Sequence, residues 1–127
     1  MNVVDSSGWL EYFGEGKNAS FFAKPIQDIE NLIVPTICIY EVFKRLISLR
    51  DKEEALRAVG VMSLGQLIEL NRQLAMNATK ISLDFQLAMA DSIIFATARA
   101  NDATLWTQDE HFRDLDGVKY IGKKVQK

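Results

Sequence analysis

The sequence predicts a three-layer α/β fold in which helices flank a mainly parallel central sheet. Short β-branched segments alternate with longer segments of helical periodicity along almost the whole chain. Parallel neighbours need crossover connections, and the helical segments supply them. The chain has 127 residues and is 48% apolar. That length and composition suit a single domain, residues 1–127, with a substantial core.

The first half of the chain carries two strand patterns and four helical ones. The first helix can be capped by Asp5 or a serine after it, and Pro25 disturbs the second helix. Pro35 ends the second strand, and Gly65 is a stop signal for the fourth helix. In chain order the segments are strand 2–4, helix 5–13, helix 19–30, strand 31–35, helix 36–50 and helix 51–65.

The second half continues the alternation. Apolar residues at helical spacing predict a helix over 71–85, and the almost wholly apolar run "AMADSIIFATARA" predicts a buried helix that ends near Asn101. Helical aromatic residues, Phe95 among them, are expected in the core. The remaining segments are strand 66–70, strand 103–107, a short helical turn at "QDEHF" and strand 118–121.

Composition excludes several classes of protein. The net charge is −2, whereas proteins that bind nucleic acid through phosphate contacts alone are usually basic, so such a role needs a local patch or a metal. One cysteine, Cys38, rules out an internal disulfide framework, fits a reducing cytoplasm and is expected to be buried. We find no signal-peptide pattern and no apolar run of the ~18 residues that a membrane span needs.

Four acids stand out by position. Asp5 directly follows the first strand, and Asp109 comes two residues after the strand that ends at Thr107. Glu41 lies in the second turn of the helix after the second strand, and Asp91 lies near the start of the buried helix. Ligands of parallel sheets bind beyond the carboxyl ends of the strands, so two of these acids are placed there by local sequence alone.

Each acid also has an ordinary structural explanation. Asp5 can cap a helix, Glu41 can pair with the basic residues three and four positions later, and "TQDE" matches a capping box with Asp109 in the first turn. A helix dipole offers Asp91 only ~0.3–1 kcal/mol. A carboxylate removed from water needs a stronger partner than that. One shared site explains the four acids better than four separate accidents.

The segments "VVDSS", "YEVFKR", "MADSIIFATA" and "LWTQDEHF" together resemble the signature of the PIN-domain nucleases, and most closely the VapC-type toxins of bacterial toxin–antitoxin pairs. The resemblance runs from Val3 to about Ile121. It implies a three-layer PIN-like fold whose motif acids gather around one or two divalent ions. Carried over to this chain, the catalytic and metal-binding acids are Asp5, Glu41, Asp91 and Asp109.

Within that set, the resemblance gives most weight as metal ligands to Asp5 and Asp91. It also matches Ser6 and Thr107 to hydroxyls that orient water or a phosphate oxygen. His111 occupies a weaker position of the pattern and stays outside the core set. Crowded carboxylates repel one another, so without metal at least one of the acids is expected to have a raised pKa.

Mg²⁺ or Mn²⁺ suits such a site, because these hard octahedral ions accept a few carboxylates and keep positions open for a phosphate. Zinc suits it less, because the sequence has no Cys/His ligand set. With one histidine in the chain, a two-histidine mechanism that uses the 2′-hydroxyl is impossible within a single chain. Metal-activated water remains as the route to hydrolysis of a phosphodiester bond.

The resemblance further implies an endoribonuclease that acts on RNA in the cytoplasm and leaves 5′-phosphate and 3′-hydroxyl ends. It implies a homodimer whose first helices and "TICIYEVF" helix form a groove for a cognate antitoxin protein. No membrane partner is expected. Phosphate contacts can come from basic residues that are otherwise solvated surface charges: Lys44, Arg45, Arg50, Lys52, Arg57 and the tail "GKKVQK".

Other readings remain open at this point. A non-toxin PIN-fold nuclease and a catalytically inactive PIN-like binding module would share the same fold. A phosphoacceptor receiver domain needs paired acids after the first strand and a lysine closing the last, but Asp5 stands alone and Lys119 opens the last strand. A dehalogenase-like phosphatase needs D-x-D, whereas this chain has Asp5, Ser6 and Ser7.

Overall fold

A five-stranded sheet forms the centre of the protein in the computed structural model, which describes residues 1–124. Every neighbouring pair of strands is parallel, and the strand order is β3-β2-β1-β4-β5. The all-parallel sheet confirms the predicted fold class. The strands are β1 (Asn2–Val4), β2 (Leu32–Pro35), β3 (Gln66–Ile68), β4 (Thr104–Thr107) and β5 (Val118–Tyr120).

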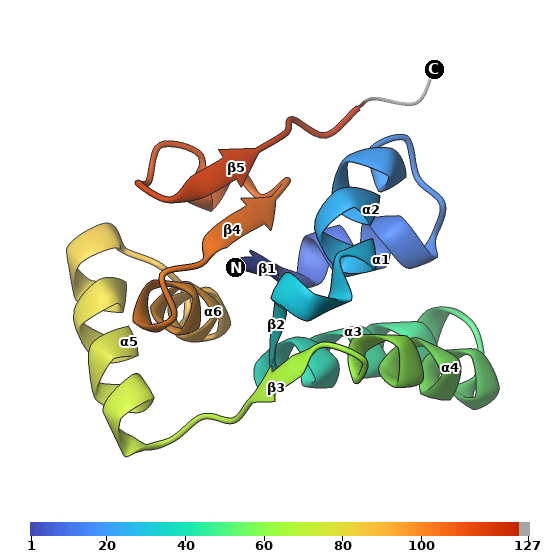
Figure 1. The fold of residues 1–127 in the computed structure, drawn as a ribbon, viewed down its shortest axis with the longest axis horizontal. Coiled ribbons are helices and arrows are strands. Elements are labelled where there is room, and N and C mark those ends of the chain that lie inside the picture. The colour runs from blue at the N-terminus through green and yellow to red at the C-terminus, as the bar shows by residue number, and fades with distance from the viewer. Residues whose placement is uncertain (125–127) are drawn as a thin grey trace.

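Six α-helices and two short 3₁₀ turns connect these strands within residues 1–124. Helices α5 and α6 lie on one side of the sheet and α1 to α4 on the other, which gives three layers (Figure 1). The helices are α1 (Ser6–Phe13), α2 (Ala19–Gln27), α3 (Thr36–Leu49), α4 (Lys52–Met62), α5 (Arg72–Phe85) and α6 (Met89–Ala100), and the turns are η1 (Ile29–Asn31) and η2 (Glu110–Phe112).

Two predicted helix boundaries differ from the structure. Pro25 lies in the last turn of α2, and the helix remains continuous before the separate turn η1. Helix α4 ends at Met62, three residues before Gly65, and the backbone N–H of its C-cap residue Ser63 donates to the carbonyl of Val59 at 2.9 Å. Gly65 itself packs tightly, since a Cβ there would lie 3.0 Å from the carbonyl oxygen of Leu32.

The core lies between the sheet and both helix layers. The strands at the centre of the sheet bury their apolar residues, and the aromatic side chains of Trp9, Phe22 and Phe95 are at most 1% exposed. Helix α6 contacts β1, β2 and β4, which explains its almost continuous apolar sequence. Cys38 is buried as predicted, and its thiol donates to the carbonyl of Val4 at 3.8 Å.

No single helix within residues 1–124 meets the length and hydropathy that a membrane crossing needs. Helices α5 and α6 meet the criterion only as a pair, and that pair is bent by 113° at its junction. Helix α6 is mostly buried against the sheet. Of the tail "GKKVQK" expected to contact phosphate, residues 125–127 lie outside the described part of the chain.

Parallel pairing brings the ends of separate strands to one edge of the sheet. Val4 pairs with Trp106, and Thr107 pairs with Tyr120. The residues that follow β1 and β4 therefore emerge side by side. Gly8 lets α1 pack closely here, because a Cβ at this position would lie 2.6 Å from the ring of Phe22.

Candidate functional site

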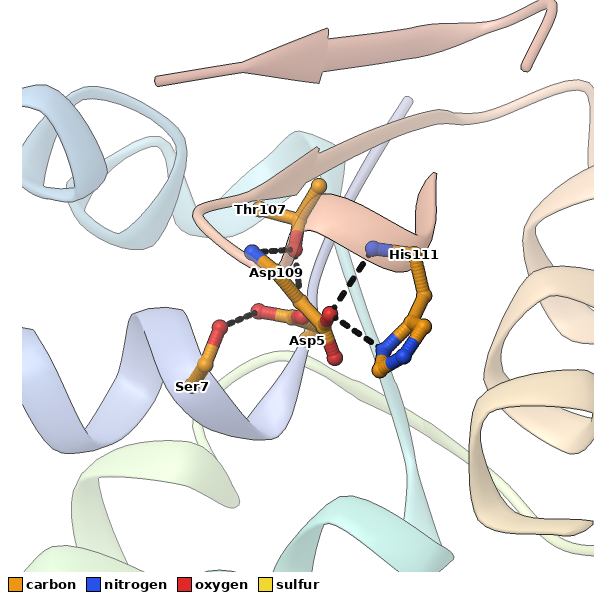
Figure 2. A network of polar contacts seen from close by, with 5 residues as sticks. All are labelled: Asp5, Ser7, Thr107, Asp109 and His111. Carbon is orange, nitrogen blue, oxygen red and sulfur yellow. Dashed lines mark hydrogen bonds and ion pairs between the residues drawn. The ribbon is translucent and has the colours of Figure 1, made fainter. Parts of the chain in front are cut away.

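Asp5 is held by three hydrogen bonds at the junction of β1 and α1, and those from Ser7 and Thr107 are drawn in Figure 2. Its Oδ1 accepts from the Ser7 hydroxyl at 2.8 Å and from the backbone N–H of Gly8 at 2.9 Å. Its Oδ2 accepts from the Thr107 hydroxyl at 2.5 Å. Asp5 is thus the N-cap of α1, one of the two explanations that the sequence allowed, while also facing the end of β4.

Burial dominates the electrostatics of Asp5, whose side chain is almost fully enclosed. Loss of hydration raises its pKa from 3.8 to about 6, against the opposing effect of its three hydrogen bonds. The carboxylate of Asp109 adds a further upward contribution. Asp5 and Asp109, 104 positions apart in sequence, therefore interact in the folded chain.

Thr107 connects Asp5 to the segment that carries Asp109. Its hydroxyl donates to Asp5 and accepts from the backbone N–H of Asp109 at 2.9 Å. Thr107 belongs to β4 and is completely buried. The capping box that "TQDE" matches, the ordinary explanation for Asp109, does not form, because Asp109 is the N-cap of η2 and accepts from the backbone N–H of His111 at 2.9 Å.

Asp91, Asp109 and His111 form a group that can hold a metal ion. Each offers one ligand atom, and these atoms lie within 4.8 Å of one another. Asp109 and His111 come from the turn after β4, whereas Asp91 lies in the first turn of α6. His111 Nδ1 lies 2.8 Å from Asp109 Oδ1, and its side chain is 73% exposed (Figure 2).

Asp91 is partly buried, and no hydrogen bond to its side chain is found within residues 1–124. Its pKa is raised from 3.8 to about 6, mainly by burial and in addition by the carboxylates of Asp109 and Glu41. The proximity of His111 acts in the opposite direction. Asp91 therefore carries a charge that the described protein residues compensate poorly.

Glu41 approaches the same region from α3. Its Oε1 accepts from the Ser6 hydroxyl at 2.6 Å, and no ion pair joins it to Lys44 or Arg45 in the described residues. Burial raises the pKa of the nearby Cys38 thiol, and the charges of Asp5, Glu41 and Asp91 raise it further. All these effects place the predicted acids around one region of the fold.

Only two of the four predicted acids belong to the metal-binding group. Asp91 and Asp109 come together in the metal-binding group, whereas Asp5 and Glu41 interact with it through their charges and lie outside that group. Ser6 and Thr107 donate to Glu41 and Asp5. The catalytic, ligand and water-orienting roles of these six residues stay predictions.

His111 is the group member that sequence reasoning left outside its core set. Its signal was present in "QDEHF", where an imidazole follows an acid by two positions in a short helical turn. The group of two carboxylates and one imidazole suits a divalent cation. No cysteine joins the group within residues 1–124.

The fold is similar to that of several solved toxin structures. A toxin–antitoxin complex from Klebsiella pneumoniae matches with a TM-score of 0.80 and 18% identity, covering 94% of this chain and 96% of the other. The sarcin–ricin loop cleaving toxin VapC20 from Mycobacterium tuberculosis matches with a TM-score of 0.76 and 12% identity, covering 91% and 95%. DNA-bound VapBC from Salmonella typhimurium matches with a TM-score of 0.73 and 14% identity, covering 96% of this chain and 98% of the other.

A search of curated proteins found no match. A comparison with protein-family models gives a match to the PIN domain over residues 3–118. That range contains all six helices and the strands β2, β3 and β4, and it includes Asp91, Asp109 and His111. It begins within β1 and ends at the first residue of β5. The chain belongs to the PIN domain family.

Proposed function

We propose that this protein is the toxin of a toxin–antitoxin pair and a metal-dependent endoribonuclease that hydrolyses phosphodiester bonds of RNA. The observation that carries the proposal is the group of Asp91, Asp109 and His111 at the carboxyl edge of the sheet. Membership of the PIN family and the fold shared with the Klebsiella and Mycobacterium toxins support it.

Asp91, Asp109 and His111 would hold the cation, and we propose Mg²⁺ or Mn²⁺, with Asp5 and Glu41 next to it. A bound divalent ion supplies a nucleophilic water at neutral pH and stabilises charge on the phosphate oxygens. Without a cation, the acidic cluster of Asp5, Glu41, Asp91 and Asp109 would repel RNA. Neutralising it lets a net-acidic protein approach a polyanion.

The chain's own residues would orient the reacting groups. Ser7, Gly8 and Thr107 fix the carboxylate of Asp5 in one orientation, and Ser6 fixes Glu41 through Oε1. The second oxygen of Glu41 has no hydrogen-bond partner within residues 1–124 and can accept a proton from an attacking water. Preorganised groups of this kind cost little reorganisation when the reaction occurs.

The proposed partners are RNA as substrate, a cognate antitoxin and a second copy of the chain, with the cytoplasm as the place of action. Several of the similar structures are toxin–antitoxin complexes. A groove between α1, α3 and α4, lined in part by Phe13, Leu46 and Val61, has a volume of about 330 Å³. Arg50, Glu54 and Arg57 add charges to this lining, and apolar and charged side chains together suit an amphipathic antitoxin helix.

The test is brief induction of the protein in cells, followed by mapping of RNA ends, together with cleavage of the same RNAs by purified protein with Mg²⁺ or with EDTA. We expect growth arrest and new 5′-phosphate ends that also form in vitro with Mg²⁺ and not with EDTA. Equal cleavage in EDTA contradicts a metal mechanism. Cleavage without growth arrest indicates a PIN nuclease that is not a toxin, and no cleavage indicates an inactive binding module.

A further inference from the structure

Three consecutive residues connect β4 to the metal-binding group, and each is held by a different contact. Thr107 donates to Asp5, and the backbone N–H of Asp109 donates to Thr107 at 2.9 Å. Between them lies Gln108, which is 7% exposed and whose Oε1 accepts from Asn18 Nδ2 at 3.0 Å. Asn18, 90 positions earlier in the chain, therefore contacts the residue that directly precedes a proposed metal ligand.

Asn18 is itself fixed by the elements around it. It is 1% exposed, its backbone N–H donates to Glu11 Oε2 at 2.8 Å, and its carbonyl accepts from the backbone N–H of Phe21 at 3.1 Å. Its Nδ2 also donates to the carbonyl of Gly122 at 3.1 Å, and this acceptor identifies the side-chain nitrogen unambiguously. Asn18 thereby joins α1 and α2 to the chain after β5, which runs toward these helices in Figure 1.

The side chain of Asn18 does not do what its position in the sequence favours. Asn18 is the N-cap residue of α2, where an asparagine usually accepts from a backbone N–H of the first turn, yet its side chain makes no such bond. Its Oδ1 is buried without a hydrogen-bond partner among residues 1–124, although buried polar atoms almost always have one. The arrangement costs stability, which indicates that the two contacts of Nδ2 serve another purpose.

Both acceptors of the Asn18 amide lie in the wall of one cavity. This cavity has a volume of about 970 Å³ and is lined by Gln108 and Gly122 together with Asp109 and His111. Two of the three members of the metal-binding group therefore share a wall with the two residues that Asn18 holds. Loss of the amide would release that wall at two points at once.

We propose that Asn18 is a positioning residue for the metal site and that it acts through Gln108. It holds the adjacent Asp109 where that carboxylate can share one cation with Asp91 and His111. The inference rests on the proposed metal-dependent function and adds to it a buried residue outside the ligand set. The ligand atoms lie within 4.8 Å of one another, and Mg²⁺ demands near-ideal geometry at about 2.0–2.1 Å. A small shift of the segment would therefore weaken the site.

The test measures binding of Mn²⁺ to the full chain without RNA, from the loss of the free-ion signal in electron paramagnetic resonance. Asn18→Ala removes both amide contacts, and Gln108→Met removes the acceptor but keeps a side chain of similar length. Asn101→Ala is the matched control, because Asn101 Nδ2 also donates to a carbonyl, that of Thr97 at 2.8 Å, at the opposite end of α6 from Asp91. Circular dichroism and a thermal melt check that each variant is folded.

We expect the dissociation constant for Mn²⁺ to rise about tenfold in Asn18→Ala and in Gln108→Met, the low end of losses for an outer-shell partner. The double variant should bind about as weakly as Asn18→Ala, because both changes break the same contact, and Asn101→Ala should bind like wild type. If Asn18→Ala does not fold, Gln108→Met decides. Unchanged affinity in either folded variant, an equal loss in the control, losses that multiply in the double variant, or no binding by wild type overturns the proposal.

Amide hydrogen exchange follows the position of the segment without any metal. The backbone N–H groups of Asp109 and His111 are both hydrogen-bonded within it. We expect these two amides to exchange faster in Asn18→Ala and Gln108→Met, while the amides of α5 exchange as in wild type. Unchanged exchange at both amides, or faster exchange throughout the chain, would mean that Asn18 has no specific effect on this segment and would contradict the proposal.

The same variants separate this proposal from the nuclease function. If Mn²⁺ binding changes as expected but wild type with Mn²⁺ cleaves no RNA, the positioning role stands and the nuclease function fails. If wild type cleaves RNA with Mn²⁺ and both variants bind Mn²⁺ and cleave equally well, the nuclease function stands and the positioning role fails.

Discussion

Asp5 and Asp91 have pKa values raised to about 6, but the surroundings of the two carboxylates differ. Asp5 is enclosed between β1 and β4 and accepts hydrogen bonds from Ser7, Gly8 and Thr107. Asp91 is partly exposed in the first turn of α6, and no hydrogen bond to its side chain is found in residues 1–124. The protein therefore satisfies one acid with its own donors and leaves the other open.

The difference indicates that the two carboxylates have different roles in the site. Both oxygens of Asp5 are engaged with donors, so its position is determined by the fold. Asp91 lies with Asp109 and His111 in the metal-binding group, and its charge needs a partner from outside the chain. On this account Asp91 depends on the cation, while Asp5 contributes fixed negative charge next to it.

The largest expected effect is on activity, from Asp91→Asn. Removing this carboxylate takes a charge from the metal-binding group, so we expect RNA cleavage to fall more than ~100-fold, beyond the usual cost of losing an outer-shell partner. Initial rates at several Mg²⁺ concentrations measure the loss, and circular dichroism checks the fold. Cleavage at the wild-type rate would place the metal elsewhere.

The second effect is on stability, from Asp5→Asn in metal-free buffer. Because the pKa of Asp5 is raised in the folded protein, the folded state binds a proton that the unfolded state has lost between pH 4 and about 6. The free energy of unfolding should thus fall as pH rises through this window, by up to ~3 kcal/mol from Asp5 alone. Asparagine removes that dependence.

Urea unfolding at pH 4 and pH 8 measures this prediction. We expect Asp5→Asn to be more stable than wild type at pH 8 and close to it at pH 4. A variant that is less stable than wild type at both pH values would mean that the three hydrogen bonds outweigh the cost of burying the charge.

A smaller loss is expected from Thr107→Val, with Ser7→Ala for comparison. Valine leaves Oδ2 of Asp5 without its donor and the backbone N–H of Asp109 without an acceptor. We expect the free energy of unfolding to fall by ~1–3 kcal/mol, against ~0.5–1.5 kcal/mol for the less buried Ser7. If denaturant titration gave equal losses of unfolding free energy for the two variants, the buried hydrogen bond of Thr107 would contribute no more to stability than that of Ser7.

The smallest expected effect concerns the exposed imidazole. If His111 is a ligand, electron paramagnetic resonance of bound Mn²⁺ should show coupling to a nitrogen nucleus, and His111→Asn should remove it. We expect Mn²⁺ affinity to fall about tenfold, the low end of losses seen around metal sites. Bound Mn²⁺ without nitrogen coupling in wild type would restrict the ligands to carboxylates.

Local sequence patterns predicted most of the fold. Apolar periodicity located the segments that became α3, α5 and α6, and β-branched runs located the strands. The pattern located helix ends less exactly: α4 ends at Met62, three residues before Gly65. That residues 1–127 form one domain stays a prediction, which a single cooperative unfolding transition would support.

The sequence predicted those site residues whose position follows from the adjacent strand. Asp5 and Asp109 follow strands directly, so their place at the edge of the sheet follows from local sequence. The approach of Glu41 and Asp91 depends on how α3 and α6 pack, and the family resemblance supplied it. The resemblance matched Thr107 to a hydroxyl that orients water or a phosphate oxygen. Its hydrogen bond to Asp5 was not predicted, because that bond depends on β4 lying beside β1.

The central claim is that a bound divalent cation compensates the charge of Asp91. Carbon-13 NMR of the aspartate side-chain carboxyl groups, assigned with Asp91→Asn, can follow its titration with and without Mg²⁺. The account predicts a pKa near 6 in the metal-free protein and a value well below 4 when Mg²⁺ is present. An ordinary pKa without metal, or a raised pKa that Mg²⁺ leaves unchanged, would contradict it.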